Sequence, residues 1–409
     1  MEKKIKMLVI PSDRQGGVGK FRSIQPHVYL QEHYKDDFDI DIVFDLPKDN
    51  LEEFLRQYDL IHIHKQLDRE GKIMDMIKFL GIPIIVDIDD HFKLGEDHPM
   101  SLTAKKEKWH EPIINHLKKA DYVTTTTPIF ADIIKKYNKN VAVLPNAIDP
   151  EEKQFSRNKN FDDNDGKLRV GLICGSTHLK DIQPLRGLCS LVRPNVQLYL
   201  CGFDTNGTRT IYHQDTGQVE RRPITPEESV WYEYEKILTD NYKTISKEHK
   251  DFLLKFMKVD DPFVNENYRR MWTRNINEYA THYQNIDLLL APLKENDFDL
   301  VKSQLKVIEA GFTDTAIIAQ DFGPYQIDIK PMFEFGGKVN EDGNGILVKS
   351  AKNHKDWVKY INRLADDLSL VRKLKDNLYN TVKDKYSLEA VSKERVKLYK
   401  ELVNKNGQE

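Results

Sequence analysis

The sequence has few cysteines, no long apolar run and almost no net charge, and each shortage excludes a class of protein. Only Cys174, Cys189 and Cys201 occur in 409 residues, all among apolar neighbours. Three thiols cannot form a disulfide framework, so we expect reduced cysteines and a cytoplasmic protein. No run approaches the roughly 20 apolar residues of a membrane span, and the N-terminal apolar run is too short for a signal peptide.

Positive and negative charges nearly cancel. Lys and Arg number 62 and Asp and Glu number 65, which gives a net charge of −3. The whole chain therefore carries no general attraction to nucleic acid, although a local basic patch stays compatible with such binding. A chain of this length is too long for one ordinary core and fits two domains of roughly 150–200 residues each.

What the sequence does contain is a regular alternation of apolar strands and amphipathic helices. In the first 150 residues we expect strands over 5–11, 39–44, 60–63, 83–88, 122–125 and 141–144. A polar linker follows over 150–166, and a second series starts at Leu168. Strands alternating with helices predict an α/β fold with parallel, doubly wound sheets. Three C-terminal helices are expected over 355–368, 370–385 and 388–403.

The second series is interrupted over 204–283. We predict a hairpin in TIYHQDTGQVERRPI and helices over 227–240 and 247–257. Basic and aromatic residues are interleaved here, a composition that suits phosphates and stacked bases or sugars. The segment is either an acceptor-binding surface or a structural insertion with its own small core. The residues are Arg209, Arg221, Arg222, Arg269, Arg270 and Arg274, with Tyr212, Trp231, Tyr232, Tyr268 and Trp272.

The stretch DLLLAPLKENDFDLVKSQLKVIEAG, residues 287–311, is the most informative motif. An apolar strand at 288–291 is followed by a charged loop and then by a helix that places Lys302, Lys306 and Glu309 at i, i+4 and i+7. A strand end, a charged loop and a helix start are the usual place for an anionic ligand in an α/β sheet. The alternative is an ordinary unit in which Lys306 only pairs with Glu309.

One glycine-containing loop follows the first strand of each half. Gly16-Gly17-Val18-Gly19 lets the backbone approach a ligand, but it matches neither a Walker P-loop nor a dinucleotide fingerprint, and it can be a plain tight turn. Gly175-Ser176-Thr177-His178-Leu179-Lys180-Asp181 offers hydroxyls and amides suited to phosphate oxygens at an expected helix start. Its alternative is a solvated Lys180 with Asp181 as helix cap.

Acidic and imidazole side chains gather at two further strand ends. His62 and His64 alternate along a strand and should face opposite ways, which argues against a metal pair. Asp87, Asp89 and Asp90 follow the next strand, where they can bind a divalent cation, cap a helix or form a solvated turn.

In this order the motifs resemble retaining GT-B glycosyltransferases of family 4, the glycosyl transferases group 1. The matching elements are the first glycine loop, Asp-x-Ile-His-x-His, Pro-Asn-x-x-Asp, Gly-Ser-x-x-His-x-Lys-Asp and Lys-Ser-x-x-Lys-x-x-Glu-Ala. The resemblance implies two Rossmann-like domains facing across a cleft. We expect an acceptor-side domain over 1–150, a nucleotide-sugar-binding domain over 167–385 with an insertion at 204–283, and a helix over 386–409 packing back toward the first domain.

The resemblance also assigns roles to single residues. Lys302 and Lys180 would neutralise the donor diphosphate, Glu309 would hold the ribose, and Asp89 stands where the family has a histidine. A second glutamate of the family pattern is replaced by Val301. No metal or other cofactor is expected. The remaining donor-binding candidates are Gly17, Gly19, Gly175, Ser176, Thr177 and Ser303.

The implied activity is transfer of a hexose or pentose from a UDP- or GDP-sugar to a hydroxyl, with retention of anomeric configuration. The acceptor is a glycan, a glycolipid or a protein. The alternatives are transfer to modified DNA bases and a GT-B protein that binds nucleotide without transferring sugar. A GT-B epimerase or phosphorylase is a further possibility. The sequence fixes neither the oligomeric state nor the donor base.

Overall fold

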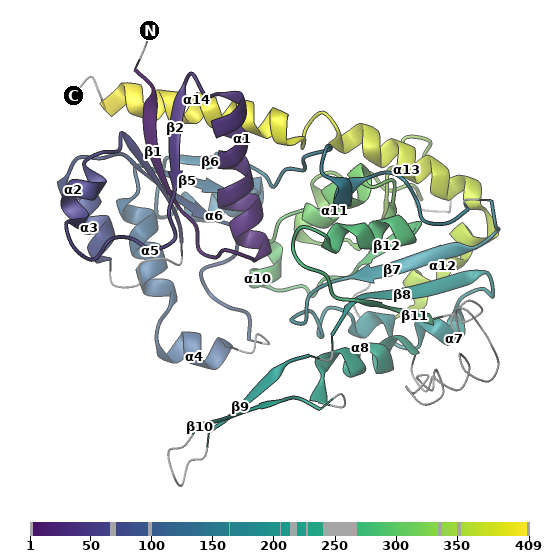
Figure 1. Ribbon diagram of the computed structural model, residues 1–409. Helices are drawn as coiled ribbons and strands as arrows, with labels where there is room; N and C mark the ends of the chain where they lie inside the picture. Colours follow the sequence, from purple (N-terminus) through teal and green to yellow (C-terminus); the bar gives the residue numbers. More distant parts are fainter. Residues whose placement is uncertain are drawn as a thin grey trace.

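The computed structural model of the protein describes residues 3–65, 71–96, 100–162, 164–204, 206–212, 219–225, 228–239, 268–333, 338–349 and 353–406. Two parallel six-stranded sheets lie side by side, each with helices around it (Figure 1). The expected α/β fold with two doubly wound halves is confirmed. The predicted helix over 247–257 lies outside the described residues.

The first sheet has strand order β2-β1-β3-β4-β5-β6, and all its pairs are parallel. Its strands are β1 (Ile5–Ile10), β2 (Phe38–Ile42), β3 (Leu60–His64), β4 (Ile84–Ile88), β5 (Tyr122–Thr125) and β6 (Val141–Val143). The helices between them are η1 (Gly19–Ile24), α1 (Gln25–His33), α2 (Leu51–Leu55), α3 (Lys72–Phe79), α4 (Ser101–Lys106), α5 (His110–Lys119) and α6 (Pro128–Ile134).

The second sheet has strand order β11-β8-β7-β12-β13-β14, again with parallel pairs. Its strands are β7 (Leu168–Ile173), β8 (Val196–Phe203), β11 (Tyr268–Trp272), β12 (Leu288–Ala291), β13 (Ala316–Gln320) and β14 (Ile346–Val348). The intervening helical elements are η2 (Lys153–Phe155), η3 (Gln183–Leu185), α7 (Leu188–Leu191), α8 (Val230–Thr239), η5 (Tyr279–Asn285), α10 (Asp297–Leu300), α11 (Leu305–Phe312) and η6 (Gly323–Gln326).

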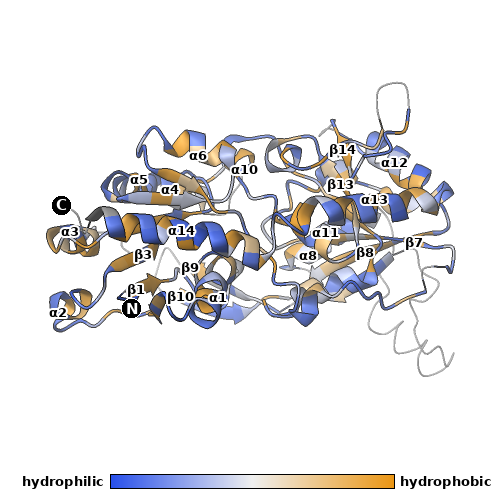
Figure 2. Cartoon of the chain, turned by 90° about the horizontal axis from the view of Figure 1, so that it is seen from above, coloured by the Kyte–Doolittle hydropathy of each residue, from blue (hydrophilic) through white to orange (hydrophobic). Residues whose placement is uncertain are grey.

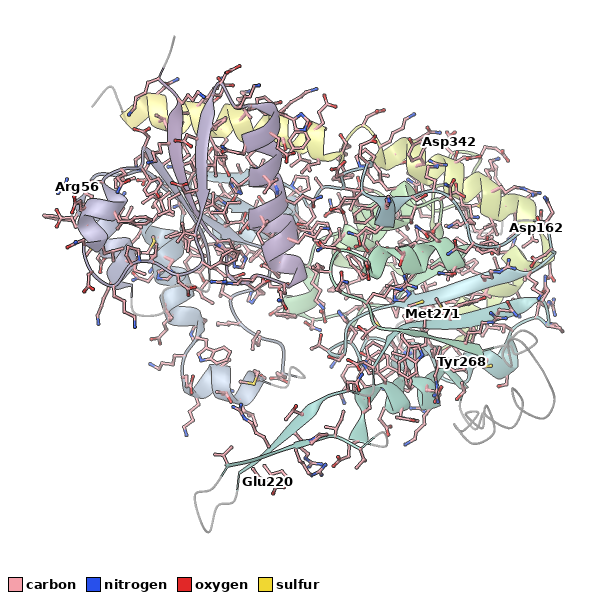
Figure 3. All side chains as sticks on the ribbon, viewed as in Figure 1. Arg56, Asp162, Glu220, Tyr268, Met271 and Asp342 are labelled. Atoms are coloured by element: carbon pink, nitrogen blue, oxygen red, sulfur yellow. The ribbon has the colours of Figure 1, made fainter. Side chains whose placement is uncertain are left out.

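The interrupting segment contributes to this second sheet. Strand β11 pairs with β8 and forms one edge of the sheet, and α8 precedes β11 in the chain. The predicted hairpin is present as β9 (Thr208–Tyr212) and β10 (Val219–Pro223), which project away from the body of the molecule (Figures 1 and 3). The segment therefore supplies a sheet strand as well as the projecting hairpin.

Successive side chains of each strand enter clusters on opposite faces of the sheet. In β1, Leu8 and Ile10 join one buried cluster, whereas Met7 and Val9 join another that contains Tyr399 of α14 (Leu388–Asn406). Burial on both faces explains why these strands read as near-continuous apolar runs. In Figure 2 the strands are mostly orange and the surrounding helices carry blue faces.

The C-terminal helices join the two halves. Helices α12 (Lys355–Asp366) and α13 (Leu368–Val382) pack against the second sheet, and α14 lies along α1 of the first half (Figure 1). The chain crosses between the halves twice at one place, where Ile148 N–H donates to Tyr386 O at 3.0 Å and Leu388 N–H donates to Ile148 O at 2.8 Å. The exact domain boundaries stay a prediction.

The buried His62 gives the fold a defined acid sensitivity. Its side chain is fully buried and neither ring nitrogen has a hydrogen-bond partner among the described residues. Burial first, opposed by Asp87 and reinforced by Arg395, lowers the pKa of His62 to about 3. In the unfolded chain His62 binds a proton near pH 6.5, whereas in the folded chain it stays neutral at that pH. Stability therefore falls as pH drops.

We expect His62→Leu to remove this pH dependence. Between pH 6.5 and 4 the histidine costs the folded state about 3 kcal/mol, a loss that the leucine variant should not show. Urea unfolding at pH 7 and pH 4 measures the difference. Equal slopes of stability against pH in both proteins would contradict the assignment.

Candidate active site

A pocket of about 790 Å³ opens between the two halves. Its floor is formed by the carboxyl ends of β7, β8 and β12, at Ile173, Cys201 and Ala291. In the second sheet, β7 connects to β8 on one side and borders β12 on the other, so the order of strands reverses here. Ligands of open parallel sheets bind at such a reversal. Gly17, Asp89 and other residues of the first half form the facing wall.

Most of the sequence-predicted site residues line this pocket. Eight of the ten candidates are brought together, from positions that span nearly 300 residues of chain. They are Gly17, Asp89, Gly175, Ser176, Thr177, Lys302, Ser303 and Glu309.

Lys180 and Gly19 do not line the pocket. Lys180 is exposed to solvent on the turn after Thr177, so the structure supports the solvated alternative for this residue. Gly19 is buried behind the pocket wall, and a Cβ there would lie 2.3 Å from the carbonyl oxygen of Asp13. Its role in this structure is to allow close backbone contact.

The first glycine loop is helical, contrary to expectation. The chain is helical from Gly17 through η1 into α1, because Asp13 accepts hydrogen bonds from the N–H groups of Gly16 and Gly19, the latter at 2.9 Å. The loop prediction treated the glycines as turn formers and missed the carboxylate cap. A helix start, with its partial positive charge, therefore lies at the pocket wall.

The second glycine loop differs in the opposite way: no helix begins after Ser176. Residues 176–182 form turns, followed only by the short η3. Asp181 does not cap a helix, because its carboxylate accepts from the His178 ring at 2.7 Å and from Lys294 N–H at 2.9 Å. The Tyr234 hydroxyl donates to Gly175 O at 2.9 Å and fixes the loop. Phosphate binding here would depend on hydroxyls and turn amides, without a helix dipole.

Lys302 lies in the loop before α11 and not on the helix. α11 begins at Leu305, so Lys302, Lys306 and Glu309 do not share one helical face. The Lys302 ammonium contacts Asp299 Oδ1 at 2.7 Å and lies 5.3 Å from the ring centre of Phe298. The side chain is partly exposed and faces the pocket, where it can pair with an anionic ligand.

Ser303 and Val301 join this loop to the first half. Asn146 Nδ2 donates to Ser303 Oγ at 3.1 Å across the interface. Val301 is fully buried in the apolar cluster of the first sheet, together with Phe92 and Phe130. A glutamate at 301 would place a charge in this apolar contact, which is unfavourable.

Glu309 is buried and held by two tyrosines. Tyr283 donates to Oε2 at 2.7 Å, Tyr279 donates to Oε1, and the Lys306 ammonium lies 3.2 Å from Oε2. Burial, followed by the Glu309 charge, raises the pKa of both tyrosines, so both remain donors. A carboxylate offers about four lone-pair positions. Glu309 can accept one more bond from a ligand hydroxyl, and its pair with Lys306 is only part of its environment.

Asp89 forms a compact charged cluster at the opposite wall. Its Oδ1 atom accepts from His64 Nε2 at 3.1 Å and from Lys65 Nζ at 2.9 Å. Burial raises the pKa of Asp89, but Lys65 and His64 outweigh it and hold that pKa well below its usual range. The carboxylate thus faces the pocket as an oriented anion that can accept a hydrogen bond from a ligand hydroxyl.

A second ion pair joins Arg22, which lines the pocket, to Asp87 behind it. Arg22 Nε and Nη2 donate to the two oxygens of Asp87 at 2.9 and 2.7 Å, and Nη1 donates to Leu144 O at 2.7 Å and Asn146 Oδ1 at 3.1 Å. Burial alone would raise the pKa of Asp87, but Arg22 lowers it to about 2. The pair therefore fixes Asn146, which binds Ser303 of the other half.

Several pocket residues were not chosen from the sequence. Tyr279, His282, Lys306 and Asn146 all line the cavity. Only Asn146 and Lys306 stand in recognised motifs, and a buried partner such as Tyr279 gives no local signal. The expected basic and aromatic surface of the interrupting segment also changes, because Trp231 and Tyr268 are buried in the second core. Arg209 and Arg222 pair with Glu228, and Arg270 with Glu235.

Metal-ligand clusters and membrane-spanning helices are both absent from the described part of the chain. No group of three or more His, Cys, Asp or Glu side chains there has a geometry that could hold a metal ion. None of the described helices is both long and apolar enough to span a bilayer.

No protein-family model and no curated protein sequence matches the chain. Solved structures do match. HepE from Anabaena in complex with UDP covers 97% of this chain and 100% of its own at 10% identity and a TM-score of 0.61. Starch synthase IV from Arabidopsis thaliana, bound to ADP and acarbose, covers 100% of both chains at 12% identity and 0.61.

A third match is an α-glucosyltransferase in complex with UDP-glucose and DNA containing an abasic site. It covers 97% of this chain and 99% of its own at 12% identity and a TM-score of 0.57. Identities this low establish a shared fold and nothing about activity. The two parallel sheets, the intervening pocket and the end-to-end match to these structures show that the chain has the GT-B fold.

Proposed function

We propose that the protein is a glycosyltransferase that uses a nucleotide-sugar donor bound in the pocket between the two sheets. The observation that carries the proposal is the convergence of Lys302, Ser303 and Glu309 at the reversal of strand order in the second sheet. A cation, a helix start and a buried carboxylate suit the diphosphate and ribose of one nucleotide. Structures with the same fold hold UDP, ADP and UDP-glucose.

In this mechanism the enzyme stabilises charge that develops on the leaving diphosphate. Lys302, Lys306 and the N-terminus of α11 supply fixed positive charge near the pocket. The bond from the anomeric carbon to the diphosphate breaks as the acceptor oxygen bonds to that carbon, and the hydroxyl proton of the acceptor passes to a diphosphate oxygen. Glu309 positions the ribose, and Asp89 accepts a hydrogen bond on the acceptor side. Retention of configuration and independence of metal follow from the family resemblance and belong to the proposal. Closure of the halves over the donor would exclude water.

A hydroxyl of a glycan, a glycolipid or a protein is the proposed acceptor. Transfer to a DNA base is the alternative, motivated by the neighbour that holds DNA and by the exposed Arg221 on the hairpin. However, Arg209 and Arg222 share one carboxylate, Glu228, which cancels one of their two positive charges and so reduces the positive charge of the described hairpin. A DNA-binding enzyme would lose affinity steeply with salt, whereas a glycan enzyme would not.

Binding of nucleoside diphosphates tests the donor site directly. At a concentration 100 times Kd, UDP or GDP should raise the unfolding free energy by about 2.7 kcal/mol, because only the folded state binds. Thermal unfolding with and without nucleotide measures this. Absence of any shift, together with absence of transfer or donor hydrolysis, would contradict the proposal. Nucleotide binding without either reaction would favour an inactive GT-B protein.

A further inference from the structure

One side of the pocket is built by residues that the mechanism above does not use. The ends of β8 and β11, the helix α8 and the short helix η5 bring together Gly202, Trp231, Thr273, Arg274 and His282. These residues continue the pocket from Glu309 toward the aromatic core of the second half. Because Glu309 is the proposed ribose contact, a group attached to the ribose would lie on this side of the pocket.

His282 is a buried polar side chain that lines the pocket without a partner. It is 2% exposed, and neither ring nitrogen has a hydrogen-bond partner among the described residues. Burial first, and then Arg274 and Lys306, lower the pKa of His282 to about 4. The backbone of Trp272 acts in the opposite direction and raises this pKa, but its distance and angle to the ring do not make a hydrogen bond. Near pH 7 the imidazole is neutral and offers one donor and one acceptor. Buried polar atoms are normally paired, so a bound ligand is the natural partner.

Gly202 lets the end of β8 pack closely against the indole of Trp231. It has φ +100°, which favours glycine, and a Cβ there would lie 3.0 Å from Cys174 O and 3.2 Å from Trp231 Cη2. A side chain at 202 would therefore collide with the end of β7 and with the indole. Gly202 and Trp231 both line the pocket, so this part of its wall is aromatic.

Arg274 supplies a fixed cation at the same place. Its Nη1 atom donates to Thr281 Oγ1 at 2.7 Å, and Thr281 immediately precedes His282. The guanidinium has donors only, so its ligand partner must be an acceptor such as a carbonyl oxygen. Arg274 and His282 together therefore present N–H donors, and the second ring nitrogen of His282 can accept a hydrogen bond beside them.

We propose that His282 and Arg274 recognise the nucleobase of the donor and favour a base with an exocyclic carbonyl, such as uracil or guanine, over adenine. The inference rests on the proposed donor site and deepens it. Arg274 would donate to the carbonyl oxygen, and His282 would pair with the adjacent ring N–H. In nucleic-acid recognition arginine likewise donates to the O6 carbonyl of guanine.

Calorimetric titration of UDP, GDP, ADP and inorganic pyrophosphate tests the inference. We expect the wild-type protein to bind UDP or GDP about tenfold more tightly than ADP, the value of one or two hydrogen bonds. His282→Leu should weaken UDP and GDP about tenfold, reduce the difference from ADP, and leave pyrophosphate unchanged. The thermal midpoint of the apo variant should be equal or higher, because no hydrogen bond is lost.

His62→Leu is the matched control, since His62 is an equally buried, unpartnered histidine that does not line the pocket. It should leave all four affinities unchanged. His282→Asn provides a second variant if the leucine protein does not fold. A folded His282 variant that keeps the wild-type base preference would overturn the inference, as would equal binding of ADP, while the donor site would stand. Wild-type protein that binds neither nucleotide nor pyrophosphate would overturn both.

Discussion

Replacing Arg22 by alanine should destabilise the protein by about 3–5 kcal/mol, the usual cost of removing one partner of a buried ion pair. Arg22 and Asp87 are 1% and 0% exposed. Without the guanidinium, Asp87 would keep, among the described residues, the hydrogen bond from Thr124 Oγ1 at 2.6 Å, within the centre of the first sheet. An uncompensated buried carboxylate would then take up a proton or admit water, and both reduce stability.

Urea unfolding at pH 7 measures this loss. The exposed pair of Arg56 with Glu52, labelled at Arg56 in Figure 3, is the matched control, and Arg56→Ala should change stability by less than about 1 kcal/mol. A double variant, Arg22→Met with Asp87→Leu, should recover much of the loss because it removes both charges. A loss in Arg22→Ala no larger than in Arg56→Ala would refute the energetic assignment.

The same variant connects stability with the pocket. Arg22 also binds Asn146, whose amide donates to Ser303 of the other half. Removing Arg22 would therefore loosen a contact that holds the two walls of the pocket together. In the wild-type protein the pair stays ionised down to about pH 2, where protonation of Asp87 ends its contribution.

The sequence predicted the fold well wherever burial is local and continuous. Strands such as Leu288–Ala291 are apolar runs because both faces of a parallel sheet are covered, and such runs can be recognised without knowing the partner strands. The prediction was weaker where a side chain decides the backbone. Asp13 extends the helix back to Gly17, and Asp181, which binds Lys294 N–H, leaves the turns after Ser176 without a helix.

The site was predictable only as far as its motifs reached. Lys302 and Glu309 stand in one continuous stretch and both line the pocket. Tyr283, which donates to Glu309, and His282, whose ring nitrogens have no hydrogen-bond partner among the described residues, lie about 26 residues earlier in a segment whose packing depends on tertiary contacts. Lys180 had the right residue type in a suitable motif, but the turn carries its side chain into solvent.

This contrast between two lysines leads to the prediction with the largest effect on activity. Lys302→Ala should lower kcat about 10²–10³-fold, the typical loss when one preorganised group that stabilises transition-state charge is removed. Stability should change by less than about 1 kcal/mol, because the Lys302–Asp299 pair is partly exposed on the lysine side. Lys302→Arg should restore part of the rate, since it returns the positive charge with different geometry.

Lys180→Ala separates the structural assignment from the motif. The family motif predicts that Lys180 neutralises the diphosphate, whereas its solvent-exposed position outside the pocket predicts a rate within about twofold of wild type. Steady-state transfer or donor hydrolysis, measured with both alanine variants at saturating donor, distinguishes the two. A large loss in Lys180→Ala together with full activity in Lys302→Ala would mean that the diphosphate lies against the loop after β7 and away from α11. Losses in both would require the turn after β7 to move so that Lys180 also reaches the donor.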